Sequence, residues 1–99
     1  MVFEGTTATS EQSVTFETSA DIVSFSIANK SGGAVTVSVG IFYGSSITYI
    51  IYNEPLGGSD PENYVYLGGR ITVPTGYAIS VSVSAICDFY FTIKPNGTT

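Results

Sequence analysis

The chain has 99 residues, of which 43% are hydrophobic, 13% aromatic and only 11% charged. One domain fits this length, and such a domain buries roughly 65% of its unfolded surface, enough for one core. Eight acidic and three basic residues give a net charge of −5, and the basic residues form no run. Nucleic-acid binding and adhesion to an anionic membrane both need clustered positive charge, so the composition is evidence against both.

The sequence also shows neither the pattern of a membrane-spanning helix nor that of a signal peptide. No stretch approaches the ~20 apolar residues that a membrane-spanning helix needs. The N-terminus, Met1-Val2-Phe3-Glu4-Gly5, has neither the basic region nor the apolar region of a signal peptide. We therefore expect a protein that stays in the cytoplasm of the cell that makes it, or is assembled into a particle there.

The first half of the chain reads as strands. Residues 1–12 predict an N-terminal arm or a short edge strand with a loop, and 14–16 a short strand. Residues 22–29 and 34–43 alternate apolar and small polar side chains, which is the two-residue period of a strand. The intervening Asn29-Lys30-Ser31-Gly32-Gly33 predicts a hairpin turn between them. The predicted inward face comprises Val23, Phe25, Ile27, Val35, Val37, Val39 and Ile41.

Residues 46–53 predict a strand that is apolar on both sides. Ile47, Tyr49 and Ile51 fall on one side, and Ile50 and Tyr52 on the other. A two-layer domain of this size has no third layer to cover a second apolar side. Ile50 and Tyr52 are therefore candidates for an interface, with a loop folded over them as the alternative.

The longest break in the alternation is 54–63. Its two prolines cannot donate ladder hydrogen bonds, and its Gly-Gly pair supplies turn conformations. Asp60, Glu62 and Asn63 offer oxygen ligands, but their spacing lacks the EF-hand pattern of a calcium site. A solvated loop is the interpretation that we adopt.

The second half continues the strand pattern. Strands are expected at 64–67, 70–73, 79–85 and 89–93, with a turn at Pro74-Thr75-Gly76-Tyr77 and a polar tail at 95–99. No segment shows a helical period over eleven residues. The chain 1–99 is thus expected to form one all-β domain, an antiparallel two-sheet sandwich of seven to nine strands. Its topology is expected to be immunoglobulin-like or jelly-roll.

No residue pattern indicates catalysis, a cofactor or a metal. The chain has no histidine, so neither a catalytic triad nor an activated Cys87 has an imidazole available. Cys87, the only cysteine, is expected to be buried and inert. The histidine and cysteine clusters that bind zinc or iron are absent from the sequence. The spacing of the acidic residues does not single out a pair of carboxylates for catalysis. We expect a protein that is not an enzyme.

Tyrosine is the residue type most suggestive of binding. There are seven, and tyrosine combines a large contact area with few rotatable bonds and a polar tip. The expected interface residues are Tyr49, Ile50, Tyr52, Tyr64 and Tyr66. Packing at the rim of a sheet would explain the same residues equally well. Aromatic rows also stack on sugar rings, although the absence of tryptophan makes a carbohydrate-binding module the weaker hypothesis.

Several segments resemble small structural proteins of tailed bacteriophages. The similar features are Ser26-Ile27-Ala28-Asn29-Lys30-Ser31, Val35 to Val39, a central Gly-Gly loop, Leu67 to Tyr77, and Ile79 to Val83. In that group an N-x-S turn precedes a G-x-I-x-L-P-x-G-D-x-I segment. Here Val73 replaces the leucine and Tyr77 the acidic residue. The resemblance covers residues 22–85 and implies a β-sandwich that works as an oligomer in the virion.

The resulting hypothesis is a non-enzymatic virion protein, made in the host cytoplasm, that decorates or cements a phage capsid. Its partners would be further copies of itself, with a trimer as one option, and a capsid or tail protein. The scarcity of charged residues indicates that part of the protein's surface is covered by a partner in the working state, because free surfaces normally carry about a quarter or more charged residues. The alternative is a glycan-binding sandwich module on a viral tail or appendage.

Overall fold

The computed structural model describes the chain except for residues 1, 8–10, 59–62, 67–69 and 96–99. The described residues form nine strands and no helix. The strands are β1 (Val2–Thr7), β2 (Gln12–Thr15), β3 (Ala20–Asn29), β4 (Val35–Tyr43), β5 (Ser46–Leu56), β6 (Asn63–Tyr66), β7 (Ile71–Val73), β8 (Ala78–Val83) and β9 (Cys87–Pro95). The expected all-β class is confirmed.

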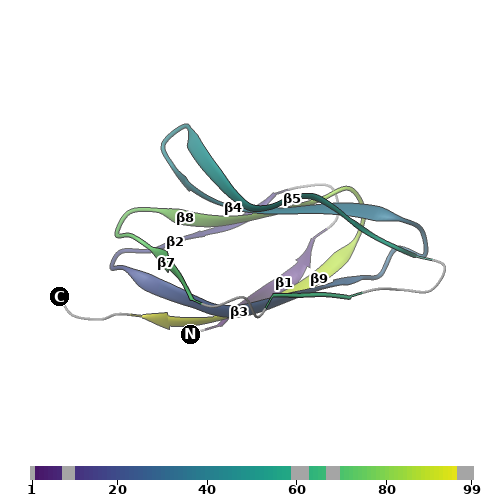
Figure 1. The fold of residues 1–99 in the computed structure, drawn as a ribbon, viewed down its shortest axis with the longest axis horizontal. Coiled ribbons are helices and arrows are strands. Elements are labelled where there is room, and N and C mark those ends of the chain that lie inside the picture. The colour runs from purple at the N-terminus through teal and green to yellow at the C-terminus, as the bar shows by residue number, and fades with distance from the viewer. Residues whose placement is uncertain (1, 8–10, 59–62, 67–69, 96–99) are drawn as a thin grey trace.

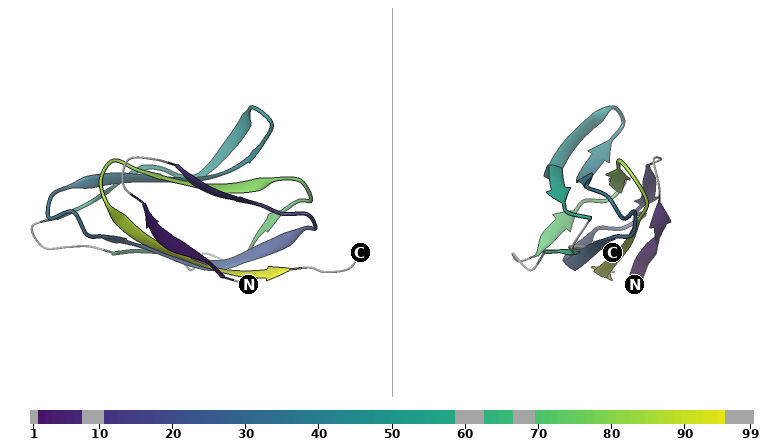
Figure 2. Two further views of the ribbon diagram at one scale, coloured as in Figure 1. Left: turned by 180° about the vertical axis from the view of Figure 1, so that it is seen from behind. Right: turned by 90° about the vertical axis from the view of Figure 1, so that its right-hand side faces the viewer.

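The strands form two antiparallel sheets that face each other as the layers of a sandwich (Figures 1 and 2). Sheet A has the order β1-β9-β3-β6, with β7 also paired to β3, and sheet B has the order β2-β8-β4-β5. Because β6 and β7 both pair with β3, they line the same edge of sheet A as one interrupted strand. The chain crosses between the sheets at most of its connections. This order is that of a jelly roll, the second of the two expected topologies.

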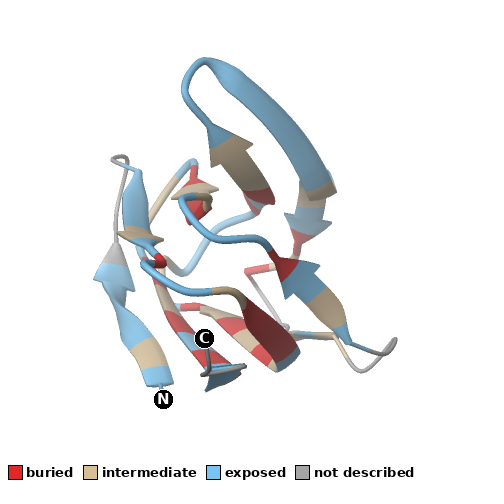
Figure 3. Ribbon diagram, turned by 90° about the vertical axis from the view of Figure 1, so that its left-hand side faces the viewer, coloured by how far each residue is buried: buried red, intermediate tan, exposed pale blue. Residues whose placement is uncertain are grey.

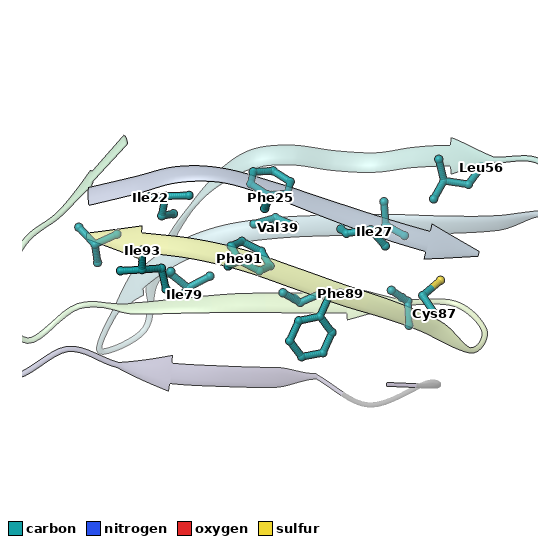
Figure 4. Packing of buried hydrophobic residues seen from close by; sticks show 14 of the residues in the cluster. Ile22, Phe25, Ile27, Val39, Leu56, Ile79, Cys87, Phe89, Phe91 and Ile93 are labelled. Carbon is teal, nitrogen blue, oxygen red and sulfur yellow. The ribbon is translucent and has the colours of Figure 1, made fainter. Parts of the chain in front are cut away.

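The core lies between the sheets and is aliphatic and aromatic throughout (Figure 4). Phe25 of β3 and Phe91 of β9 lie side by side with ring centroids 4.7 Å apart, and both are almost fully buried. Val37, Val39 and Ile79 face them from sheet B with no exposed surface. Cys87 is fully buried, as predicted, and burial raises the pKa of its thiol.

The predicted hairpin between 22–29 and 34–43 is wrong. Both segments are strands, but β3 belongs to sheet A and β4 to sheet B, so they face each other across the core. Alternation defines which side chains point inward, and it is the same whether two successive strands pair or face each other. The loop between them is therefore an arch over the end of the sandwich.

Asn29 holds that arch together. Its amide nitrogen lies 2.8 Å from the carbonyl oxygen of Gly33, 3.3 Å from that of Leu56 and 3.0 Å from that of Gly57. Its side-chain oxygen accepts hydrogen bonds from the amide and the hydroxyl of Ser31, each at 2.9 Å. The Asn-x-Ser element of the sequence thus joins the end of β3 to the end of β5.

Val23, predicted to point inward, is instead 37% exposed. The pairing of β3 with β9 shifts its register between Ile22 and Ser24, so one extra residue is inserted there. An extra residue in one strand disrupts alternation locally. Ile22 therefore takes the core position with no exposed surface, and Phe25 resumes the inward series.

The other strand boundaries in the structure differ by a few residues from those predicted from the sequence. Residues 2–7 form an edge strand, the second of the two readings of the N-terminus. β5 continues through Glu54 and Pro55 to Leu56, which a proline permits on an edge strand. The turn at 74–77 is confirmed: the Tyr77 amide donates to the Pro74 carbonyl oxygen at 3.1 Å, and Gly76 has a φ of 85° in the third position. Asp60, Glu62 and the tail at 96–99 lie outside the described residues.

Candidate interaction surface

The tip of the β4–β5 hairpin projects from the sandwich, and we call residues 41–50 the arm (Figures 1 and 3). The two strands pair up to Tyr43 and Ser46, and Gly44 supplies the positive φ of 60° in the two-residue turn. Every residue from 43 to 49 is exposed. The arm therefore carries apolar side chains that the domain itself leaves uncovered.

Irregular pairing in β5 decides which side chains point outward. Val39 pairs with Ile51 and the next residue, Gly40, pairs with Tyr49, so Ile50 is an inserted residue. As a result both Ile50 and Ile51 pack against the core. The expectation that Ile50 shares an outward side with Tyr52 is wrong, because a bulge turns two successive residues toward the same side.

Tyr49 and Tyr52 come together on the outer side of the sheet. Their ring centroids lie 4.7 Å apart, and they are 44% and 64% exposed. The sequence placed them on opposite sides of β5, and the inserted residue brings them to one side. A tilted pair of exposed tyrosines presents a large contact area with few rotatable bonds.

Ile47 extends this surface toward the tip. It is 40% exposed, pairs with Phe42 across the hairpin and lies against Gly40. A side chain at position 40 would come within 3.0 Å of Ile47, so glycine allows this close approach. We call Phe42, Ile47, Tyr49 and Tyr52 the arm patch. The sequence analysis did not single out Phe42, and it placed Ile47 on the side of the strand opposite Ile50 and Tyr52.

Beside the arm patch, the outer face of sheet B is lined with small hydroxyl side chains. An open hollow of about 190 Å³ is bounded by Thr36, Ser38, Asn53, Ser82, Val83 and Ser84. The Ser38 hydroxyl accepts a hydrogen bond from the Asn53 amide at 2.9 Å, and the Ser84 hydroxyl accepts one from the Thr36 amide at 2.9 Å. We call this the serine hollow. It is recessed, whereas the neighbouring arm protrudes.

Charge is distributed unequally between the two sheets. No charged residue occurs in 31–53 or in 71–87, the segments that contain β4, most of β5 and β8. Within the strands of sheet B the one charged residue is Glu54, which pairs with buried Val37 and lies close enough to affect Tyr64 of sheet A. Glu11 precedes β2, and its carboxylate accepts a hydrogen bond from Ser80 at 2.7 Å.

Sheet A carries the charge instead. Glu4, Asp21, Asp88 and Lys94 all lie in its strands. Thr6 donates a hydrogen bond to Asp88 and Lys30 lies 3.4 Å from it, and these contacts hold the pKa of that carboxyl below its usual value. The outer face of sheet B is thus close to neutral in a chain of net charge −5.

Tyr64 and Tyr66 do not join the arm patch. They lie on β6 of sheet A, partly buried, and both rings stack on Phe25 with centroids 5.9 and 5.0 Å away. Burial, with a smaller effect of Glu54, raises the pKa of Tyr64. The five expected interface residues therefore separate into Tyr49 and Tyr52 on the surface, and Ile50, Tyr64 and Tyr66 against the core.

Among the described residues, no three acidic or cysteine side chains gather closely enough to hold a metal ion. The same part of the chain contains no helix able to cross a membrane. Comparison of the chain with protein-family models, with curated proteins and with solved structures yields no match. The surface of sheet B is therefore interpreted from its own chemistry.

Proposed function

We propose that this chain is a non-enzymatic structural protein of a virion, which decorates or cements a phage capsid through protein–protein contacts. The observation that carries the proposal is the projecting arm, whose exposed tyrosines and isoleucine adjoin a nearly neutral sheet face. Exposed apolar patches rimmed by polar residues are typical of protein interfaces. Lysine, which interfaces lack at their centres, is absent from the strands of sheet B, and the carboxylate of Glu11 lies at one side of the surface, beside Phe42 and Ile47.

The fold and the sequence resemblance also support the virion assignment. The jelly roll is an architecture that viral capsid domains use, although a fold alone does not define a function. The resemblance of residues 22–85 to small tailed-phage structural proteins points the same way, and Asn29 and Ser31 of its N-x-S turn have a clear structural role here.

Co-sedimentation with capsid shells tests the assignment. The major capsid protein encoded in the same genome would be expressed with and without this chain, and the shells purified on a density gradient. We expect the chain to sediment with the shells at a fixed stoichiometry. Recovery of all of it in the soluble fraction, with shells properly formed, would reject decoration of the capsid.

A glycan-binding module is the second candidate function, and a hollow on sheet A favours it. The hollow measures about 330 Å³, and its lining includes Glu4, Thr6, Ser26, Asp88 and Tyr90. Tyr90 is 47% exposed, so its ring is available for stacking on a sugar, with carboxylates and hydroxyls beside it. A glycan array probed with and without calcium tests this, and loss of signal in Tyr90→Ala would locate the site.

A further inference from the structure

We propose that the outer face of sheet B binds a second copy of this chain across a twofold axis, with the arm of each copy seated on the serine hollow of the other. This deepens the proposed function, on which it rests, by naming the partner of that surface. The charge, the shape and the strand register of this face all support the pairing.

The distribution of charge between the two sheets favours a second copy of the chain as the partner of this face. Two chains of net charge −5 repel each other unless their charged surfaces point apart. Joining sheet B to sheet B does this, because Glu4, Asp88 and Lys94 lie on the strands of sheet A. The carboxylate of Glu11 lies beside Phe42 and Ile47 of the arm. In the dimer it would meet the hydroxyl and amide groups of a serine hollow, which are able to donate hydrogen bonds to it.

Shape supplies the second argument. The arm patch protrudes with Ile47, Tyr49 and Tyr52, and the serine hollow is recessed and lined by small side chains. The arm tip and the serine hollow lie on the same face of sheet B, toward opposite ends of β4. A twofold axis that runs parallel to this face and crosses β4 near its middle therefore brings each arm tip over a hollow, which makes the face complementary to itself.

The strand register then predicts which residues meet. Along β4 the arm end is marked by Phe42, paired with Ile47, and the hollow end by Thr36, whose amide bonds to Ser84. An axis midway between these ends places Ile47 of one copy near Ser84 of the other. Within one chain the two positions are separated by six residues of β4, or roughly 20 Å, so they cannot be bridged in the same chain.

Disulfide trapping uses this separation. Ile47→Cys and Ser84→Cys would be purified separately as full chains, mixed and mildly oxidised, with buried Cys87 left unreactive. We expect a disulfide-linked heterodimer in the mixture, in excess of either homodimer. Ile47→Cys mixed with Tyr90→Cys, a residue exposed on sheet A, is the matched control and should give no such product. Equal trapping in both mixtures would overturn the arrangement.

Sedimentation equilibrium gives the independent test. We expect wild type to have twice the chain mass of 10.4 kDa, and Tyr49→Ser/Tyr52→Ser to dissociate at least tenfold more readily because buried tyrosines carry much of an interface. Val65→Ser/Tyr90→Ser removes comparably exposed side chains from sheet A and should remain dimeric. Ser82→Glu, which keeps both tyrosines and places a negative charge on the face, should also dissociate.

Three outcomes would refute the dimer: a wild-type monomer at ~100 µM, a trimer, or a dimer that survives both Tyr49→Ser/Tyr52→Ser and Ser82→Glu. Circular dichroism of each variant separates loss of assembly from loss of fold. A monomer that still co-sediments with shells would refute this inference alone. A dimer that does not co-sediment would refute the virion assignment alone.

Discussion

Replacing Asn29 by alanine is expected to destabilise the fold by about 2–6 kcal/mol. The side chain is only 6% exposed, and its amide group is shared by the carbonyl oxygens of Gly33, Leu56 and Gly57. Two net hydrogen bonds are lost at about 0.5–1.5 kcal/mol each, and a buried carbonyl left without a donor costs a further ~1–3 kcal/mol. The arch between the sheets therefore depends on one side chain.

Equilibrium unfolding in urea, followed by circular dichroism, measures this loss. Ser31→Ala is the control, because it removes one hydroxyl and leaves the Asn29 amide bonds in place, and it should cost less than about 1 kcal/mol. Thermal unfolding gives the same comparison. At ~4–8 °C per kcal/mol for a domain of this size, the melting temperature of Asn29→Ala should fall well below that of Ser31→Ala. A loss below about 0.5 kcal/mol with an unchanged urea dependence would show that water replaces the amide without cost.

Three further predictions concern the core, the arm and pH. Val37→Asp buries an unpaired carboxylate and should cost several kcal/mol in urea unfolding, whereas Thr92→Asp, at an exposed position on sheet A, should cost little. Gly40→Ala places a methyl group 3.0 Å from Ile47 and 3.1 Å from the Thr48 carbonyl oxygen, so faster amide exchange is expected in the arm, and an unchanged arm would contradict this contact. Because burial raises the pKa of the Cys87 thiol, the unfolded thiol ionises first, and stability should fall as pH rises above about 8.5. Unfolding measured from pH 7 to pH 9.5 checks this, and Cys87→Ala should lack that part of the decline.

Much of the fold could be predicted because burial leaves a period of two in the sequence. Ile27, Val35 and Val39 point inward as expected, since each sheet has one covered face. Which strands pair could not be predicted, because β3 and β4 show the same alternation whether they lie in one sheet or in two. The inserted residue at Val23 has no sequence signature either, and its effect is limited to that position.

The candidate surface was predictable only in part, and the reason is again the inserted residues. Alternation along 46–53 separates Tyr49 from Tyr52, whereas the insertion at Ile50 joins them. Tyr64 and Tyr66 were expected at an interface from their residue type alone, and tyrosine suits packing at the rim of a sheet equally well. Their stacking on Phe25 depends on the pairing of β3 with β6, a contact between segments far apart in the chain.

The neutral face illustrates how topology creates a property that no single segment has. The uncharged stretches 31–53 and 71–87 are separated by Glu54, Arg70 and the loop between them. In a jelly roll, β4 and β8 are neighbours, so the two stretches merge into one surface. Solubility of the free domain would favour charge somewhere on a surface of that extent. Charged residues are absent from β4 and β8, and an exposed apolar arm lies beside these strands. This combination is expected if the face is covered in the assembled state.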